Sequence, residues 1–175
     1  KAHWPAEFLC ARLAYWGGFH HPAIYMAEAR RLGIGVRPPH INHSRSRFTL
    51  EYERQGSEWR PVLWMGLGQV RDLRRSAVRD IVRERRRAPF LELGDLLRRV
   101  RLQAKEVNHL IRCGALDGLG KSRAELQIEA QDVVWAGNAL QLALPFDRPE
   151  ATSESASERL TWERQVLGIQ VSVHP

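Results

Sequence analysis

Cysteine, acidic charge and long apolar runs are all scarce in this chain of 175 residues. Its two cysteines, Cys10 and Cys113, cannot make a disulfide framework, which favours a reducing, cytoplasmic location. No apolar run approaches the roughly 20 residues that cross a bilayer, and no secretory signal is recognisable, so we expect no membrane contact. These absences argue against secreted, disulfide-rich and membrane-spanning proteins.

Catalytic signatures are missing as well. The sequence has neither a Gly-x-Ser-x-Gly turn nor a complete phosphate-cradling loop, and Gly66-x-Gly68 lacks the third glycine of a dinucleotide fingerprint. The acids lie mostly in predicted helices or in a polar tract, which does not suit the paired carboxylates of a two-magnesium centre. Taken alone, the sequence therefore predicts no catalytic residue and no cofactor.

Four of the five histidines in the first quarter of the chain are His20, His21, His40 and His43. His40 and His43 fall in a proline-stiffened loop, with no cysteine or carboxylate at ligand spacing nearby. This arrangement favours exposed or locally hydrogen-bonded histidines over a zinc site.

Positive charge, by contrast, is abundant and concentrated. The formal net charge is +7, and the sequence pI is about 10.2. Between Arg71 and Arg101 there are eleven arginines against five acids, so six of the seven excess charges lie in that stretch. The planar guanidinium suits phosphate oxygens, and a basic surface suits a polyanion such as a nucleic acid. The alternative is a solvated helix face that is merely rich in arginine.

Residues 66–87 carry the pattern that organises the chain. A glycine-punctuated turn leads into a helix that we expect to begin near Ser76, whose hydroxyl can cap the first turn. Val78, Ile81 and Val82 form an apolar face. Another face carries Arg75, Arg79, Arg83 and Arg86. A tight turn that feeds a helix N-terminus suits phosphate, because free amides and the helix dipole favour an anion there. The pattern predicts a helix-hairpin-helix module that holds a nucleic-acid backbone without reading bases.

The periodicity of the remaining chain predicts a mainly α fold with a small β-hairpin. The expected elements are helices over residues 5–16, 22–31, 92–100, 103–113 and 121–135, and strands over residues 48–53 and 61–67. Two helix pairs joined by glycine turns result, at residues 66–82 and 105–126. From residue 136 onward the composition predicts a flexible C-terminal linker, followed by a helix that turns into a strand over residues 160–173.

A short apolar peptide, Gln141–Phe146, lies in the predicted linker. Its sequence QLALPF alternates apolar side chains and resembles an extended peptide that fills pockets on a partner. The alternative is a linker segment that packs back on its own domain.

Several motifs follow one another along nearly the whole chain. They are KAHWPAEF, AEARRLGI, RPPHINHS, GLGQVRDL, PFLELGDLLRRV, LIRCGALDGLG and VLGIQVSVHP. Together they closely resemble a bacterial C-family DNA polymerase, either the polymerase III alpha subunit or its error-prone relatives.

The resemblance implies four parts. Residues 1–53 would be the C-terminal part of the polymerase fingers, and residues 54–135 a tandem helix-hairpin-helix region that binds duplex DNA. Residues 136–159 would be a linker with a sliding-clamp peptide, and residues 160–175 the lead-in to an OB-fold domain. The chain would then be cut from a longer DNA-directed DNA polymerase, and inactive alone because the catalytic palm lies upstream. Magnesium is implied for that whole polymerase and not for this chain.

The basic pattern and the resemblance together assign binding residues and partners. DNA contacts are expected from Arg71, Arg74, Arg75, Ser76, Arg79, Arg83 and Lys121. Clamp contacts are expected from Gln141, Leu142, Leu144 and Phe146. No catalytic or metal-binding residue is assigned. The expected partners are double-stranded primer-template DNA, a sliding clamp and, through the whole polymerase, other replisome subunits.

The first hairpin departs from the family pattern Gly-hydrophobic-Gly, because Asp72, Leu73 and Arg74 stand at those positions. Asp tolerates a left-handed backbone better than most residues, whereas Arg does not. We therefore expect the side chains of Arg71, Arg74 and Arg75 to replace backbone amides as phosphate contacts. QLALPF favours a replicative enzyme. The alternatives are an error-prone translesion polymerase, a non-catalytic DNA-binding accessory module and a protein-interaction scaffold.

Overall fold

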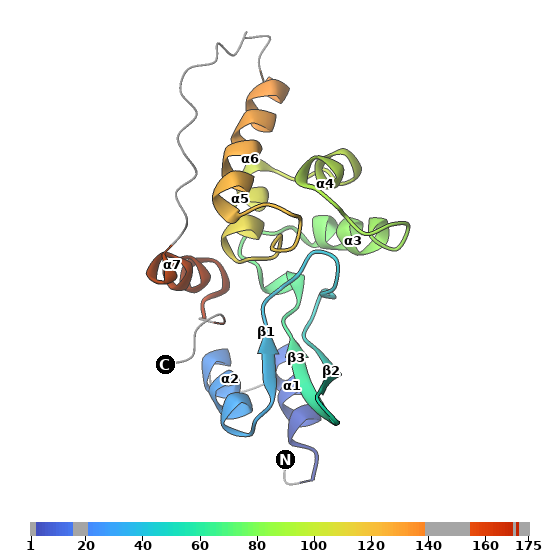
Figure 1. Ribbon diagram of the computed structural model, residues 1–175, viewed down its shortest axis with the longest axis vertical. Helices are drawn as coiled ribbons and strands as arrows, with labels where there is room; N and C mark the ends of the chain where they lie inside the picture. Colours follow the sequence, from blue (N-terminus) through green and yellow to red (C-terminus); the bar gives the residue numbers. More distant parts are fainter. Residues whose placement is uncertain (1–2, 16–20, 139–154, 170, 172–175) are drawn as a thin grey trace.

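The computed structural model describes residues 3–15, 21–138, 155–169 and 171 (Figure 1). The elements in these ranges are α1 (Pro5–Tyr15), α2 (Pro22–Arg31), β1 (Gly35–Arg37), β2 (Thr49–Gln55), β3 (Glu58–Trp64), the 3-10 helix η1 (Leu67–Gln69), α3 (Arg75–Glu84), α4 (Leu93–Arg99), α5 (Ala104–Arg112), α6 (Arg123–Asn138) and α7 (Ala156–Leu167). The predicted mainly α fold with a small β-hairpin is confirmed. None of the described helices is long and apolar enough to cross a membrane.

The N-terminal part is a three-stranded sheet with two helices. The strand order is β1-β3-β2, so β3 is the central strand. β2 and β3 form the predicted hairpin, which pairs Gln55 with Glu58 across a two-residue turn. The second strand, predicted over residues 61–67, is Glu58–Trp64, because the chain leaves the sheet after Trp64 and turns into η1. Gly56 in that turn has φ 64°, a left-handed conformation that glycine adopts readily. The parallel pairing of β1 with β3, which joins Gly35 to Val62, was not predicted.

A second, larger core holds the helical part together. It is built from α3, α4, α5, the start of α6 and the turns between them, and its largest fully buried side chains include Leu67, Ile81, Phe90, Leu93, Leu96, Leu110 and Ile111. Figure 1 shows these helices gathered at one end of the molecule, with the sheet, α1 and α2 at the other. The predicted helix pairs are therefore present as two hairpins around one core.

Gly66 and Gly68 serve the close packing of two backbone segments. A Cβ atom on Gly66 would lie 2.5 Å from the Ser46 carbonyl oxygen, and one on Gly68 would lie 2.6 Å from the same atom. The amides of Leu67 and Gly68 donate to the carbonyls of Arg45 (2.8 Å) and Ser46 (2.9 Å). The two glycines thus allow the loop before β2 to pack against η1, so their role here is backbone packing.

Helix α7 connects the two cores. Val166 belongs to the core of the helical part, whereas Ile169 and Val171 pack into the core between the sheet and α1 and α2. The prediction of a helix from residue 160 placed its start too late. Ser155 caps α7 and forms a capping box with Glu158, inside a stretch that the composition had assigned to a linker. No strand follows α7 among the described residues.

Candidate nucleic-acid interface

Two hairpins in the helical part are candidates for holding a phosphate. The first lies between η1 and α3, and the second lies between α5 and α6. Both lead directly into a helix N-terminus, where backbone amides and the helix dipole favour an anion. They differ in whether those amides are available.

The backbone of the first hairpin is left-handed at one position. Asp72 has φ 59° and is the single non-glycine residue with positive φ among the described residues. Arg74, at the other family glycine position, has φ −63° and ψ 141°, an ordinary extended conformation. Arg74 therefore does not adopt the left-handed backbone that Gly120, the last glycine of the second hairpin, has with φ 77°.

The amides of the first hairpin already have acceptors. The amide of Arg71 donates to the Val166 carbonyl of α7 at 3.0 Å, and the amide of Leu73 donates to the Val70 carbonyl at 3.3 Å. The amide of Arg74 donates to Glu106 Oε1 at 2.9 Å. These three amides of the first hairpin are therefore occupied inside the protein.

Glu106 acts as an internal anion at the start of α3. Its side chain is 1% exposed, and its two oxygens accept from Nε and Nη2 of Arg74, both at 2.9 Å. It also accepts from the Gln103 amide at 2.7 Å. Burial alone would raise the pKa of Glu106, but the hydrogen bonds from Arg74 and Gln103 together hold that pKa below its ordinary value. The carboxylate is therefore ionised beside the amide and guanidinium of Arg74, at the start of α3.

The structure corrects the predicted role of Ser76. The N-cap of α3 is Arg74, whose side chain accepts no capping bond, so Ser76 lies within the first turn. The hydroxyl is exposed and does not close the helix. The capping function belongs to Glu106, because its carboxylate accepts from the Arg74 amide.

The second hairpin has the family pattern Gly-hydrophobic-Gly. Gly118 and Gly120 have φ 97° and 77°, and Leu119 between them is buried in the helical core. Gly118, Gly120 and Lys121 are exposed. Within the described part of the chain, the amides of Gly120 and Lys121 meet no protein acceptor. This hairpin therefore presents the amides of its last glycine and of the next residue to solvent.

Helix α6 begins directly behind these donors. Ser122 and Glu125 exchange hydrogen bonds, from the Ser122 amide to Glu125 Oε2 (2.7 Å) and from the Glu125 amide to Ser122 Oγ (3.3 Å). Lys121 Nζ lies 2.9 Å from Glu129 Oε2, on the surface. A tight turn, exposed amides, a helix N-terminus and a lysine therefore occur together, although Lys121 was the single residue that sequence reasoning assigned here.

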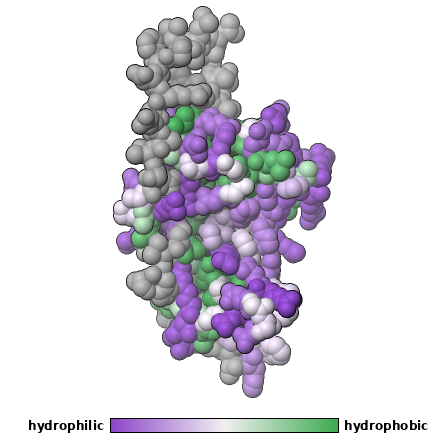
Figure 2. All heavy atoms as spheres, viewed as in Figure 1, coloured by the Kyte–Doolittle hydropathy of each residue, from purple (hydrophilic) through white to green (hydrophobic). Residues whose placement is uncertain are grey.

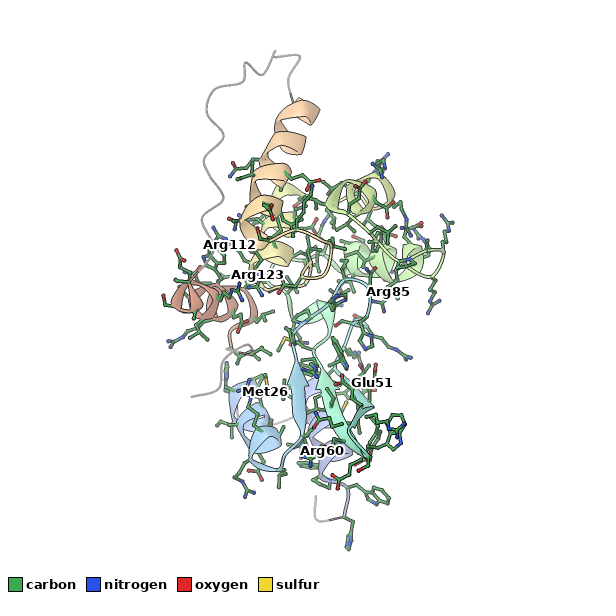
Figure 3. The ribbon with its side chains drawn as sticks, viewed as in Figure 1. Met26, Glu51, Arg60, Arg85, Arg112 and Arg123 are labelled. Atoms are coloured by element: carbon green, nitrogen blue, oxygen red, sulfur yellow. The ribbon has the colours of Figure 1, made fainter. Side chains whose placement is uncertain are left out.

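The second hairpin is held in place by an ion pair beneath its turn and by the loop between β1 and β2. Arg123 donates to both oxygens of Asp117, at 2.9 Å and 2.6 Å, beneath the turn (Figure 3). The Ile41 amide donates to the Ala115 carbonyl at 2.8 Å. His40 Nε2 lies 3.4 Å from where a Cβ on Gly118 would be. The loop between β1 and β2 therefore braces the hairpin from below.

The predicted DNA-binding arginines fall into two groups. Arg75 and Arg79 are exposed and form no ion pair with any other described residue. Arg74 is engaged by Glu106, and Arg83 lies 2.9 Å from Asp80 and 3.2 Å from Glu84. Figure 2 shows hydrophilic residues over much of the surface around α3.

Arg71 and Asp72 occupy the tip of the first hairpin. Arg71 is exposed, with its Nε 3.9 Å from Asp72 Oδ2. Asp72 is held more closely by Lys105 at 2.7 Å, and this hydrogen bond lowers the pKa of the Asp72 carboxyl. A negative charge therefore remains on the tip of the first hairpin.

His40 and His43 lie in the loop between β1 and β2, and each has its own hydrogen-bonding partner. His40 Nδ1 accepts from the Asn42 amide at 3.2 Å, and His43 Nε2 lies 3.0 Å from Glu51 Oε2. His43 also stacks on Trp64, with ring centroids 3.9 Å apart. Among the residues that the structure describes, no group of three or more His, Cys, Asp or Glu side chains could hold a metal ion.

The predicted clamp residues Gln141, Leu142, Leu144 and Phe146 lie outside the described residues.

Comparisons with known proteins point to one family. Residues 33–126 match the family model of the helix-hairpin-helix motif. Over its whole length the chain is 32% identical to an error-prone DNA polymerase of Pseudomonas aeruginosa, of which it covers 17%, and 32% identical to the DNA polymerase III alpha subunit of Thermus aquaticus, of which it covers 15%. It is 29% identical to the DNA polymerase III alpha subunit of Helicobacter pylori, of which it covers 17%. The chain thus spans about a sixth of the length of these relatives.

Proposed function

The chain belongs to the helix-hairpin-helix family in the form found in bacterial C-family DNA polymerases, and from this premise we propose that it binds the phosphate backbone of double-stranded DNA without reading base sequence. One observation carries the proposal. The second hairpin presents the unpartnered amides of Gly120 and Lys121 just before α6, and Arg123 and His40 brace this hairpin from below. Such a site recognises a phosphate and no base edge.

The second hairpin would bind a phosphate through its backbone. The amides of Gly120 and Lys121 donate to phosphate oxygens, and the dipole of α6 adds a favourable field. Lys121 would exchange its surface contact with Glu129 for the phosphate. Because glycine has no Cβ, the DNA backbone can approach the turn closely.

Helix α3 would supply side-chain contacts. Arg75 and Arg79 lie one helical turn apart and have no carboxylate partner among the described residues, so binding a phosphate breaks no ion pair. Arg71 would add a contact at the turn. The first hairpin would contribute little through its backbone, since Glu106 and Val166 already accept from its amides.

The whole protein would be a DNA-directed DNA polymerase. Curated relatives of both kinds, replicative and error-prone, match this chain with 32% identity, so similarity supports the family equally for both classes. The described residues do not offer a fitting set of metal ligands, and we assign no catalytic step to them. Our proposal places this chain beside a catalytic centre elsewhere in the polymerase. With magnesium and a primed template, the chain alone is expected to incorporate no nucleotide.

Gln141–Phe146 would dock on a sliding clamp. In an extended backbone the apolar side chains of Leu142, Leu144 and Phe146 project to one side, and Gln141 can both donate and accept a hydrogen bond. Burial of one such side chain is worth about 1.5–3 kcal/mol, so Leu144→Ala or Phe146→Ala should each weaken binding roughly tenfold or more. A titration of the cognate clamp with a peptide of residues 138–148 tests this. Equal binding of the native and substituted peptides would refute it.

The salt dependence of DNA binding tests the proposed function. If about four phosphates are neutralised, the logarithm of the association constant should fall with the logarithm of salt concentration at a slope near −3.6. Duplexes of unrelated sequence should give the same slope and affinity, because phosphates carry no sequence information. A strong preference for one sequence, or no binding at low salt, would contradict the proposal.

A further inference from the structure

Arg85 lies at a junction between the helical part and the sheet. Its Nη1 donates to the carbonyls of Ile41 (3.1 Å) and Ser44 (2.6 Å), both in the loop between β1 and β2. Figure 3 shows Arg85 beside this loop, below α3. The side chain is half-buried, so its charge is fixed in place.

Two further arginines lie beside Arg85. Arg45 follows Ser44 in the chain, and its carbonyl is held by the Leu67 amide at 2.8 Å. Arg86 is the next residue after Arg85, at the end of α3. Burial lowers the pKa of Arg85, and the charges of Arg45 and Arg86 lower it further. The charges of Arg45 and Arg86 therefore each lie close enough to Arg85 to repel its guanidinium group.

The three arginines differ from their neighbours in having no acid beside them. Arg83 and Arg87 share Glu84, Arg98 lies beside Glu92, and Arg99 pairs with Asp95. By contrast, no described carboxylate lies within ion-pair distance of Arg45, Arg85 or Arg86. Arg45 and Arg86 are also exposed, so their charges can be reached from solvent.

This cluster adjoins the second hairpin. His40 lies against Gly118 and bonds to the Asp117 backbone, and it is also close enough to Arg85 to feel its charge. Burial lowers the pKa of His40, so the ring is mostly neutral near pH 7. The loop between β1 and β2 thus links the two places, because His40 lies against Gly118 and the carbonyls of Ile41 and Ser44 accept from Arg85.

We propose that Arg45 and Arg86, positioned by Arg85, form a second phosphate-binding site that takes the backbone of the same DNA held by the second hairpin. The inference rests on the proposed function and extends it to a loop that lies outside the helix-hairpin-helix elements. A phosphodiester fits because it brings negative charge to three clustered cations and presents planar pairs of oxygens to guanidinium groups. The DNA track then crosses from the second hairpin to the loop before β2.

The double substitution Arg45→Ala with Arg86→Ala tests this site in the chain of residues 1–175. The matched control is Arg54→Ala with Arg60→Ala, which removes the same charge from the outer end of the β2–β3 hairpin. Two phosphate contacts beyond the four of the proposed function would give the native chain a salt slope of about −5.4. Their loss should return the slope to about −3.6 and weaken duplex binding roughly tenfold, whereas the control should change the slope little.

Two further measurements separate binding from structure. The thermal unfolding midpoint of the Arg45/Arg86 variant should not fall, because the substitution removes mutual repulsion. Duplexes with a single neutral methylphosphonate linkage should reveal positions where neutralisation weakens the native chain but not the variant. Equal salt slopes for the variant and its control would overturn the second site while leaving the proposed function intact. If the native chain fails to bind any duplex, the proposed function itself fails.

Discussion

Glu106 has the strongest influence of any single residue on how the two hairpins differ. It is fully buried, yet it is held ionised by Arg74 and by two backbone amides. Its carboxylate lies 32 residues along the chain from the helix start that it stabilises. Local sequence patterns cannot reveal such a contact, which is why Ser76 was predicted as the cap. The one local signal was Gln103-x-x-Glu106, which forms a capping box at α5.

Replacing Glu106 with Gln should lower the free energy of unfolding by about 1–3 kcal/mol at pH 7, since charged hydrogen bonds are lost. The pKa of Glu106 is lowered in the folded state, so its stabilising contribution is complete above the unfolded value near 4.3 and disappears as pH falls through the folded value. Urea denaturation across pH should therefore show the two proteins converging in acid. Glu58→Gln, on the exposed end of the hairpin, is the control and should show no such loss. A Glu106 effect that is independent of pH would contradict this account.

Asp72 and Arg74 should respond oppositely to glycine. Asp72→Gly suits the backbone, because φ is 59°, and it removes a negative charge from the tip of the first hairpin while freeing Lys105. We expect little change in the unfolding midpoint and tighter DNA binding. Arg74→Gly should instead lower the midpoint, because Glu106 loses its guanidinium partner. Thermal unfolding and duplex titration of both variants check this, and stronger binding by Arg74→Gly alone would contradict it.

At the scale of elements, periodicity located most helices within a few residues. The apolar spacing of Val78 and Ile81 predicted α3, and proline and glycine marked the ends of several others. Alternation predicted the β2–β3 hairpin. The parallel strand β1 was missed, because three residues carry too little pattern and the partner is supplied by tertiary packing. Helix α7 was placed late because its capping box looked like a polar linker.

Helix α3 should contribute to DNA binding unevenly along its length. Substituting Arg75 and Arg79 with Ala together should flatten the salt slope by about 1.8 units, as each removes one phosphate contact. Adding Arg83→Ala should change the slope much less, since Arg83 is occupied by Asp80 and Glu84. Sequence reasoning treated the three arginines as equivalent, because acids on the same helix are visible but their pairing is not. Equal steps for all three would contradict the structure.

At the scale of the whole molecule, the two cores are joined at two places. Helix α7 contributes Val166 to one core, while Ile169 and Val171 enter the other. The loop between β1 and β2 leaves the sheet and braces the second hairpin through His40 and Ile41. These contacts hold the basic surface in one arrangement, which prepares it for a stiff ligand such as duplex DNA. The charge composition predicted a polyanionic ligand. It could not reveal which backbone amides are occupied by long-range contacts, such as those that Val166 and Glu106 make with the first hairpin.

The central claim is that the second hairpin holds DNA through its backbone, and a pair of glycine substitutions tests it most directly. Gly120 and Gly56 both have left-handed φ, 77° and 64°, and a Cβ on either would meet no atom within 4 Å. Gly120→Ala and Gly56→Ala should therefore cost similar stability, about 1–2 kcal/mol. The account predicts that only Gly120→Ala weakens duplex binding, by roughly tenfold, because the methyl group blocks the approach of a phosphate to the amides. Equal DNA affinities for the two variants, measured at the same salt concentration, would contradict it.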